Sequence, residues 1–414
     1  MPSPETPPNR PHTPAALLAL TVVMAFVLAV PGLLSTLGKQ GLHKLLTEQN
    51  TQKDMGRLLQ RMAFSDPKIL PVYGSSELTR VEPNRADKFF ESAPTGFRVC
   101  PVGAAGNTTF MIAQKIAAQG GRVRNHKLVV LLSTSWFRRP QVPPDHYRGT
   151  FSVAQATEIM VSNQLDHDIR RRFAQRMLDY PETLKDQPAL SARVHQVADS
   201  GAGSYFRSLA QRPMLHLQHT SLGVEDNLGT IMSLTGAGKP SSNEELPVAV
   251  VPFPTPFSWD PILKESDTYA LPPFGKPAPE KDYARTDAEG SRNKSFIAGF
   301  DVDHNKEWTD FELLLDTLKN LDAKPLIIAI PLDGQYEGAH GTDLEGRNFY
   351  YGRLEKMCTA RGIAFTHLAE HDQDKLFVVE HSSHVTGKGW LYLNHVFDEF
   401  YHDRLGAAAG SKDS

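Results

Sequence analysis

The chain has 414 residues, of which 40% are apolar and 22% are charged, and its formal net charge is −3. Its 44 Lys and Arg residues nearly balance its 47 Asp and Glu residues, so we expect neither a disordered chain nor the basic surface of a nucleic-acid-binding protein. Its two Cys residues exclude a disulfide-rich scaffold and a cysteine-built zinc module, and they leave open one disulfide bond between Cys100 and Cys358.

The N-terminal region predicts a membrane anchor. Residues 1–14 contain six Pro residues, and we expect them to form a short disordered tail. Residues 15–34 contain no charged side chain, and as a helix they would span about 30 Å, the thickness of the hydrocarbon core of a bilayer. A cleaved signal peptide is the alternative, but the apolar run is longer than the usual core of such a peptide. We therefore expect a single transmembrane helix that holds the remaining residues at a membrane surface.

The chain after the anchor alternates helix and strand patterns. Residues 35–66 carry Leu residues at helical spacing and predict a connecting helix. Short apolar runs then predict strands, and most of these runs are continuous rather than alternating, which is typical of buried strands in a parallel sheet. The runs cover residues 69–73, 97–102, 128–132, 248–251, 326–330 and 363–365.

Amphipathic helices are predicted at 307–321 and at 389–405, where apolar side chains recur on one face. The alternation of strands and helices predicts an α/β domain over residues 67–405 with a doubly wound, mostly parallel sheet. Residues 138–293 are richer in helix and loop signals and are interpreted as a helical, lid-like insertion. Residues 406–414 are expected to be a disordered tail.

The first predicted strand ends in two serines, Ser75 and Ser76. In an open parallel sheet, ligands bind at the carboxyl ends of the strands. A hydroxyl at such an end can meet the backbone N–H groups of the next helix, which is a suitable setting for a nucleophile. The alternative is that the serines only cap that helix.

The loops after the second and third strands add further candidates. Gly106 and Asn107 follow the second strand, where they can turn backbone N–H groups towards a cleft and form an oxyanion hole. The alternative is an ordinary tight loop in which Asn107 or Thr108 caps a helix. Ser135 follows the third strand and could line a substrate pocket.

A histidine-containing segment at 380–384 precedes the last predicted helix. His384 could reach across the strand ends to the serine and act as its general base. One alternative is a non-catalytic pair of surface histidines. Another is binding of a metal by His381 and His384, but no carboxylate or third His is placed to complete a site, so we expect no metal.

Taken together, these loops are similar to the arrangement of SGNH (GDSL-type) hydrolases. More specifically, the chain resembles the DltD family, membrane-anchored proteins of D-alanyl transfer to teichoic acids. The resemblance covers residues 67–403, and the segments that carry it are 74–78, 102–109, 132–137, 310–312, 330–334 and 384–390.

The resemblance implies roles for individual residues. Ser76 would be the nucleophile, with Ser75 as the alternative, and His384 would be the base. Gly106 and Asn107 would form the oxyanion region. A further difference from the family lies at Thr134 and Ser135, where the family tends to carry Pro-Gln, and this difference could alter acyl or acceptor specificity.

The family also has an Asp three residues before the base, and this chain carries His381 there. Glu380 is a possible orienting acid, although neighbouring residues of an extended segment point in opposite directions. Asp372 and Asp374 are more distant alternatives, and a dyad without any acid is another.

The function implied by the resemblance is acyl transfer on the outer face of the cytoplasmic membrane. A serine-bound D-alanyl group would pass to a cell-envelope polymer, and no cofactor is needed for this chemistry. The implied partners are a membrane-bound acyltransferase and an acyl-carrier protein. The alternatives are an O-acetyl esterase or acetyltransferase of an exopolysaccharide, and a catalytically weakened scaffold of the D-alanylation complex.

Overall fold

The computed structural model describes residues 39–138, 141–199, 202–234, 250–269, 305–339, 344–374, 376–379 and 384–405, together with positions 14, 18 and 21. The anchor predicted at 15–34 and the tails predicted at 1–14 and 406–414 fall almost wholly outside these residues. Among the residues that are described, no helix combines the length and the apolar character needed to cross a membrane.

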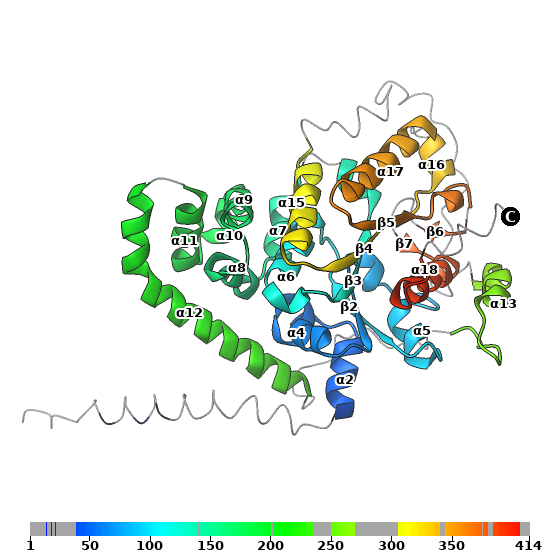
Figure 1. Cartoon of the computed structure of the whole chain (residues 1–414), viewed down its shortest axis with the longest axis horizontal. Helices are drawn as coiled ribbons and strands as arrows, with labels where there is room; N and C mark the ends of the chain where they lie inside the picture. Colours follow the sequence, from blue (N-terminus) through cyan, green and yellow to red (C-terminus); the bar gives the residue numbers. More distant parts are fainter. Residues whose placement is uncertain are drawn as a thin grey trace, which may run out of the picture.

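A five-stranded sheet lies at the centre of the molecule, and all of its strand pairs are parallel (Figure 1). The strand order is β2-β1-β3-β4-β5, so the chain crosses from one side of β1 to the other after β2. The strands are β1 (Ile69–Gly74), β2 (Arg98–Gly103), β3 (Lys127–Leu132), β4 (Lys324–Ala329) and β5 (Ala364–His367). The predicted α/β class and parallel sheet are thereby confirmed.

The continuous apolar runs are explained by burial of the sheet on both faces. In β3, Leu128, Val130 and Leu132 pack into one core, whereas Val129 and Leu131 pack into the other. A strand covered on both sides needs apolar side chains at every position, so its sequence does not alternate.

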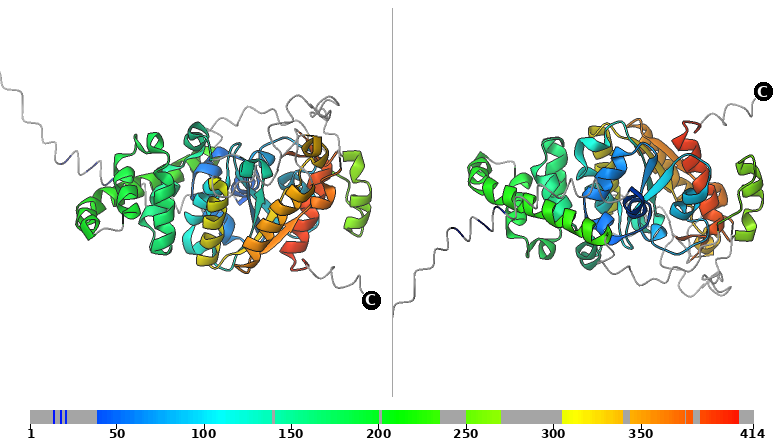
Figure 2. Two further views of the ribbon diagram at one scale, coloured as in Figure 1. Left: turned by 90° about the horizontal axis from the view of Figure 1, so that it is seen from above. Right: turned by 90° about the horizontal axis from the view of Figure 1, so that it is seen from below.

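Helices cover the two faces of the sheet (Figure 2). One core contains side chains from α6 (Thr109–Ala117), α15 (Lys306–Asn320) and α17 (Leu344–Thr359). The other core contains side chains from α5 (Ala86–Ser92) and α18 (Gly387–Tyr401). The predicted helices at 307–321 and 389–405 correspond to α15 and α18.

The described parts of the predicted insertion lie in two separate places. Its main part forms a helical group at one end of the molecule, and α13 (Trp259–Lys264) packs against α18 at the opposite end (Figure 1). The helices of the group are α7 (Pro144–Thr150), α8 (Val153–Val161), α9 (His167–Met177), α10 (Pro181–Leu184), α11 (Pro188–Ala198) and α12 (Ala202–Leu234). Only the start of this region, at 141–146, borders the cavity described below.

The prediction of one connecting helix over 35–66 is wrong for the described residues of that range. They form three short helices, α2 (Lys39–Thr47), α3 (Thr51–Met55) and α4 (Leu58–Ser65). Asn50 is extended and caps α3 with its side chain, and Gly56 is extended as well. These two breaks allow the segment to fold back onto the sheet, where Leu59 is buried in the core.

The strand predicted at 248–251 is also absent from its described residues, Val250 and Val251, which are irregular. Val251 is buried, and its backbone N–H donates to Asn84 Oδ1 at 2.8 Å. A side chain therefore supplies the hydrogen bond that a neighbouring strand would have made, so the apolar run reflects burial alone.

The remaining elements are short. They are the helix α16 (Gly334–Ala339), the strands β6 (Val378–Val379) and β7 (His384–Val385), and the turns η1 (Ser76–Leu78), η2 (Gly120–Val123), η3 (Thr134–Arg138), η4 (Ser266–Tyr269) and η6 (Ala369–His371). Cys100 in β2 and Cys358 in α17 are both buried free thiols, so they do not form the disulfide bond that the sequence left open.

Candidate active site

The candidate site lies at the carboxyl ends of β1, β2 and β3. The loops that follow these strands carry the predicted residues Ser76, Gly106 and Ser135, and all three line one cavity of about 150 Å³. The chain leaves β1 for the edge strand β2 and then returns past β1 to β3, so the loops diverge here. A crevice at such a change of direction is the usual ligand site of an open α/β sheet.

The two serines after β1 have different surroundings. Ser76 begins the turn η1 and is half-buried, and its Oγ lies 2.8 Å from His384 Nε2. Ser75 is buried, and its Oγ donates to the carbonyl oxygen of Ala104 at 3.3 Å. The structure therefore brings Ser76, rather than Ser75, to the histidine.

His384 is held by a short hairpin and by the start of the last helix. It lies in β7, which pairs with β6 in the antiparallel sense. Two residues later, Thr386 caps α18 and donates from its hydroxyl to the carbonyl oxygen of Leu376 at 2.8 Å. These contacts fix the direction in which the chain enters α18, and they present the imidazole to the loop after β1.

A buried carboxyl group supports the serine turn from beneath. Glu77 is 1% exposed, and its Oε1 accepts the backbone N–H of Ser75 at 2.5 Å. Burial raises the pKa of the Glu77 carboxyl to about 7. A Cβ at position 74 would lie 2.2 Å from Glu77 Oε1, so a larger residue than Gly74 would have to displace this carboxyl group. The hydrogen bond from the Ser75 N–H to Glu77 holds the turn that carries Ser76.

The second nitrogen of the imidazole faces a cation. Arg80 Nη1 lies 3.4 Å from His384 Nδ1, and Arg80 Nε donates to Glu82 Oε1 at 2.8 Å. A guanidinium group can only donate, so this contact suits the tautomer whose Nε2 carries the proton. A general base needs the other tautomer, in which Nδ1 carries the proton and Nε2 is free to accept. Glu380 and His381 lie outside the described residues.

The two distant acids considered as substitutes have other contacts. Asp372 Oδ1 accepts the backbone N–H of Leu332 at 2.9 Å and the hydroxyl of Tyr351 at 2.8 Å. Burial raises the pKa of Asp372 to about 6. Asp374 pairs with Lys388 at the start of α18. Both carboxyl groups therefore hold the loops around the strand ends.

The cavity beside Ser76 is lined by hydroxyl groups, a few apolar surfaces and two titratable side chains. Its lining residues are Ser75, Ser76, Gly106, Thr108, Ser135, Trp136, Gln141, Val142, Pro143, His146 and Glu307. The side-chain hydroxyl groups of Ser135 and Ser133 lie 2.9 Å apart. Small polar side chains around a nucleophile leave room for a small acyl group.

Ser76 and Gly106, which both line the cavity, have backbone N–H groups that are candidate donors for an oxyanion hole. Neither the N–H of Ser76 nor that of Gly106 donates to another described residue. Gly106 has a φ of +87°, a left-handed conformation that Gly adopts without strain. Unpaired N–H groups beside a nucleophile can stabilise the negative charge that develops when it attacks a carbonyl group.

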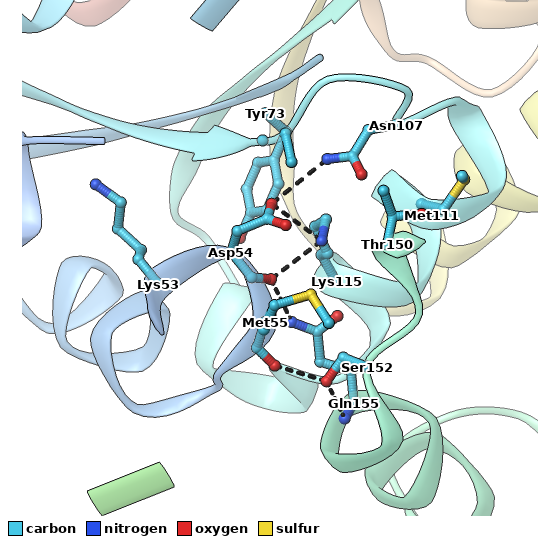
Figure 3. Close-up of polar contacts among 12 residues, drawn as sticks. Lys53, Asp54, Met55, Tyr73, Asn107, Met111, Lys115, Thr150, Ser152 and Gln155 are labelled. Atoms are coloured by element: carbon cyan, nitrogen blue, oxygen red, sulfur yellow. Dashed lines mark hydrogen bonds and ion pairs between the residues drawn. The ribbon is translucent and has the colours of Figure 1, made fainter. Parts of the chain in front are cut away.

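Asn107 lies beneath the cavity and does not line it. This residue is fully buried, and its side-chain NH₂ donates to Gly74 O at 3.3 Å and to Asp54 Oδ1 at 3.4 Å (Figure 3). It thereby links the loop after β2 to the end of β1, immediately before the two serines.

A buried ion pair anchors this link. Asp54 Oδ1 lies 3.0 Å from Lys115 Nζ, and Lys115 also donates to the backbone carbonyl of Asp54 at 3.0 Å (Figure 3). Gln155 from α8 donates to the same carbonyl at 2.8 Å. The short helix α3 is therefore fastened to α6 and α8 below the candidate oxyanion loop.

Comparison with known proteins identifies the family. A family model described as DltD protein matches residues 46–402, which is most of the chain. The chain belongs to the DltD family. Curated relatives named Protein DltD come from Bacillus subtilis (strain 168), with 24% identity over 92% of this chain and 96% of the relative, and from Staphylococcus aureus (strain NCTC 8325 / PS 47), with 22% identity over 93% and 94%. A third, from Lacticaseibacillus rhamnosus, is 20% identical over 93% of this chain and 89% of the relative.

Sequence reasoning missed several residues of the site in this DltD-family chain. Lys115 carries a recognisable signal, because it is the one charged residue of a mostly apolar helix. Glu307 looks like an ordinary acid in the first turn of α15, where it suits the helix dipole. Arg80 lies in an irregular polar loop, and nothing in the local pattern marks it.

Proposed function

We propose that this DltD-family chain transfers D-alanyl groups onto a cell-envelope polymer through an ester on Ser76 Oγ. The proposal extends to an SGNH-like active site and to a membrane anchor at residues 15–34, with the folded domain on the outer face of the cytoplasmic membrane. Its strongest support is the 2.8 Å contact between Ser76 Oγ and His384 Nε2 at the edge of the cavity.

The proposed reaction has two displacements. In the first, Ser76 Oγ attacks the carbonyl carbon of an activated D-alanyl donor while His384 Nε2 takes the serine proton, and that proton then passes to the departing group. In the second, a polymer hydroxyl attacks the Ser76 ester, the polymer oxygen becomes acylated, and Ser76 regains a proton. The N–H groups of Ser76 and Gly106 would stabilise the oxyanion in both displacements.

The proposed partners follow from the same resemblance. A membrane-bound acyltransferase and an acyl-carrier protein would bring the D-alanyl group to the site. The acceptor is a hydroxyl-bearing envelope polymer, for which teichoic acid is the family's substrate.

A second candidate function, that of a scaffold, is favoured by one observation. The position three residues before His384 is a His, and Arg80 Nη1 lies 3.4 Å from His384 Nδ1. A base without an orienting carboxylate loses rate by up to about 10⁴-fold. A scaffold of the D-alanylation complex would tolerate this loss, because a scaffold needs no catalytic turnover.

Labelling with a fluorophosphonate probe separates the two functions. We expect the full-length protein to react with the probe at Ser76, since labelling requires an activated serine. Ser76→Ala should abolish the label, whereas the matched control Ser75→Ala should retain it. A wild-type protein that stays unlabelled would favour the scaffold, and a label lost only in Ser75→Ala would move the nucleophile to Ser75.

A further inference from the structure

The cavity beside Ser76 contains a buried carboxyl group that none of the proposed catalytic steps uses. Glu307 lies in the first turn of α15, is 3% exposed and lines the cavity. Its Oε1 accepts both the backbone N–H and the side-chain hydroxyl of Thr109 at the start of α6. Among the described residues, no donor bonds to Oε2.

The charge of Glu307 is not neutralised by a nearby side chain. No cationic group of a described residue lies within 4.0 Å of its carboxylate. Arg176, whose charge lowers the pKa of Glu307 only slightly, bonds Asp310 through both Nε and Nη2, and Lys306 pairs with Asp179. An ionised carboxylate in this position lacks the compensation that buried charges normally have.

Because its charge is uncompensated, the carboxyl group of Glu307 holds its proton more strongly than an exposed Glu does. Burial, together with the negative charge of Asp310, raises the pKa of Glu307 to about 7. A ligand that brought a positive charge into the cavity would favour the ionised form and would form a charge-assisted hydrogen bond with it.

The remaining lining residues indicate which kind of cation fits. Among the described residues, no group of three His, Cys, Asp or Glu side chains could hold a metal ion. The cavity offers hydroxyl groups, the imidazole of His146 and one carboxylate, that of Glu307, and the carboxylate matches a small organic ammonium group. The volume of about 150 Å³ suits a short aminoacyl group attached to Ser76.

We infer that Glu307 binds the ammonium group of the acyl donor and makes the site selective for aminoacyl groups over neutral acyl groups of the same size. This inference rests on the proposed acyl transfer at Ser76. It also distinguishes D-alanyl transfer from the alternative acetyl transfer, because an acetyl group has no ammonium group that could bind a buried carboxylate.

The test compares two thioesters of one small thiol, one carrying D-alanine and one carrying propionate, which differ by an ammonium group in place of a hydrogen. Single-turnover acylation of Ser76 is measured for each in the full-length protein. The wild type should favour the D-alanyl donor by at least about tenfold, as expected when a site leaves a buried charge unpaired with the neutral analogue.

The variant Glu307→Gln keeps an oxygen for Thr109 and removes the charge. The ratio of D-alanyl to propionyl rates should fall about tenfold or more in this variant. Glu312→Gln is the matched control. Glu312 lies in the same helix as Glu307, but its exposed carboxylate pairs with Arg361 outside the cavity. An unchanged ratio in Glu307→Gln would overturn the inference.

Calorimetry with two unreactive amides keeps the inference testable if acylation fails or if the variant does not fold. The wild type should bind D-alaninamide more tightly than propionamide, and equal affinities would overturn the inference without any variant. Absence of Ser76 acylation by either thioester, with the preference for D-alaninamide intact, would count against the proposed reaction and leave the ammonium site standing.

Discussion

The loop after β2 separates two polar regions that are built differently. Below the loop, Asp54, Lys115 and Asn107 are almost fully buried and bond to one another and to the backbone. Above it, Ser76 and His384 are half-buried and in contact with each other, and Ser76 lines the open cavity. Buried polar groups must be paired, whereas reacting groups must remain accessible. The difference indicates that the lower region holds the loop in place while the upper region is available for chemistry.

The largest expected effect on stability comes from breaking the lower region. Asp54→Ala leaves the Lys115 ammonium group buried without its carboxylate, so it should lower the free energy of unfolding by about 3–5 kcal/mol. Urea denaturation monitors this loss. Asp168→Ala, which removes an exposed pair with Arg171, is the control and should change stability by less than about 1 kcal/mol. A small effect for Asp54→Ala would mean that the buried pair does not fasten the loop.

The next largest expected effect is on the pH dependence of stability, and it comes from Glu77 in the serine turn between the two regions. The pKa of Glu77 is about 7 in the folded chain and 4.5 when unperturbed, so between these values the folded state keeps a proton that the unfolded state releases. Stability therefore falls as the pH rises through this window, by about 3 kcal/mol at about 1.4 kcal/mol per unit.

Glu77→Gln should remove this part of the pH dependence, because an amide does not titrate. Denaturation curves at about pH 5 and about pH 8 measure the difference between variant and wild type. Glu182→Gln, an exposed carboxylate in α10, is a suitable control. Identical slopes in Glu77→Gln and wild type would show that Glu77 is not a buried neutral acid.

These expectations combine features that the sequence predicted with features that it did not. Short apolar runs were sufficient to predict the five strands of the sheet, and in β1 to β4 burial on both faces explains why those runs are continuous. Val250 and Val251 belong to a similar apolar run but do not form a strand, since a residue can be buried without strand pairing. The breaks at Asn50 and Gly56 were missed because each depends on a single residue within a helical pattern.

The candidate site shows the same limit. Order along the chain was enough to predict that Ser76, at the carboxyl end of β1, and His384, just before the last helix, come together. The choice between the two serines depends on which one turns away from the core. Ser75 is buried and bonds the carbonyl oxygen of Ala104, whereas Ser76 is half-buried and bonds His384. Glu307 enters the cavity from a helix nearly 200 residues away from Thr109, so no local pattern could reveal it.

The smallest predicted effect concerns the orientation of the base in the upper region. Restoring the family's carboxylate by His381→Asp should raise the single-turnover rate of Ser76 acylation by about tenfold, because a carboxylate stabilises the imidazolium and selects the productive tautomer. Glu380→Gln is measured beside it. A large loss of rate in Glu380→Gln, with no gain in His381→Asp, would identify Glu380 as the orienting acid already in use.

The central claim is that Ser76 carries the acyl group during transfer, and mass spectrometry tests it directly. The full-length protein is mixed with a D-alanyl thioester, quenched with acid and digested, and the peptide that contains Ser75 and Ser76 is analysed. The account predicts a D-alanyl ester on Ser76 that accumulates without acceptor, persists in Ser75→Ala and disappears in Ser76→Ala. Continued D-alanylation of the envelope polymer in cells that carry only Ser76→Ala would contradict it.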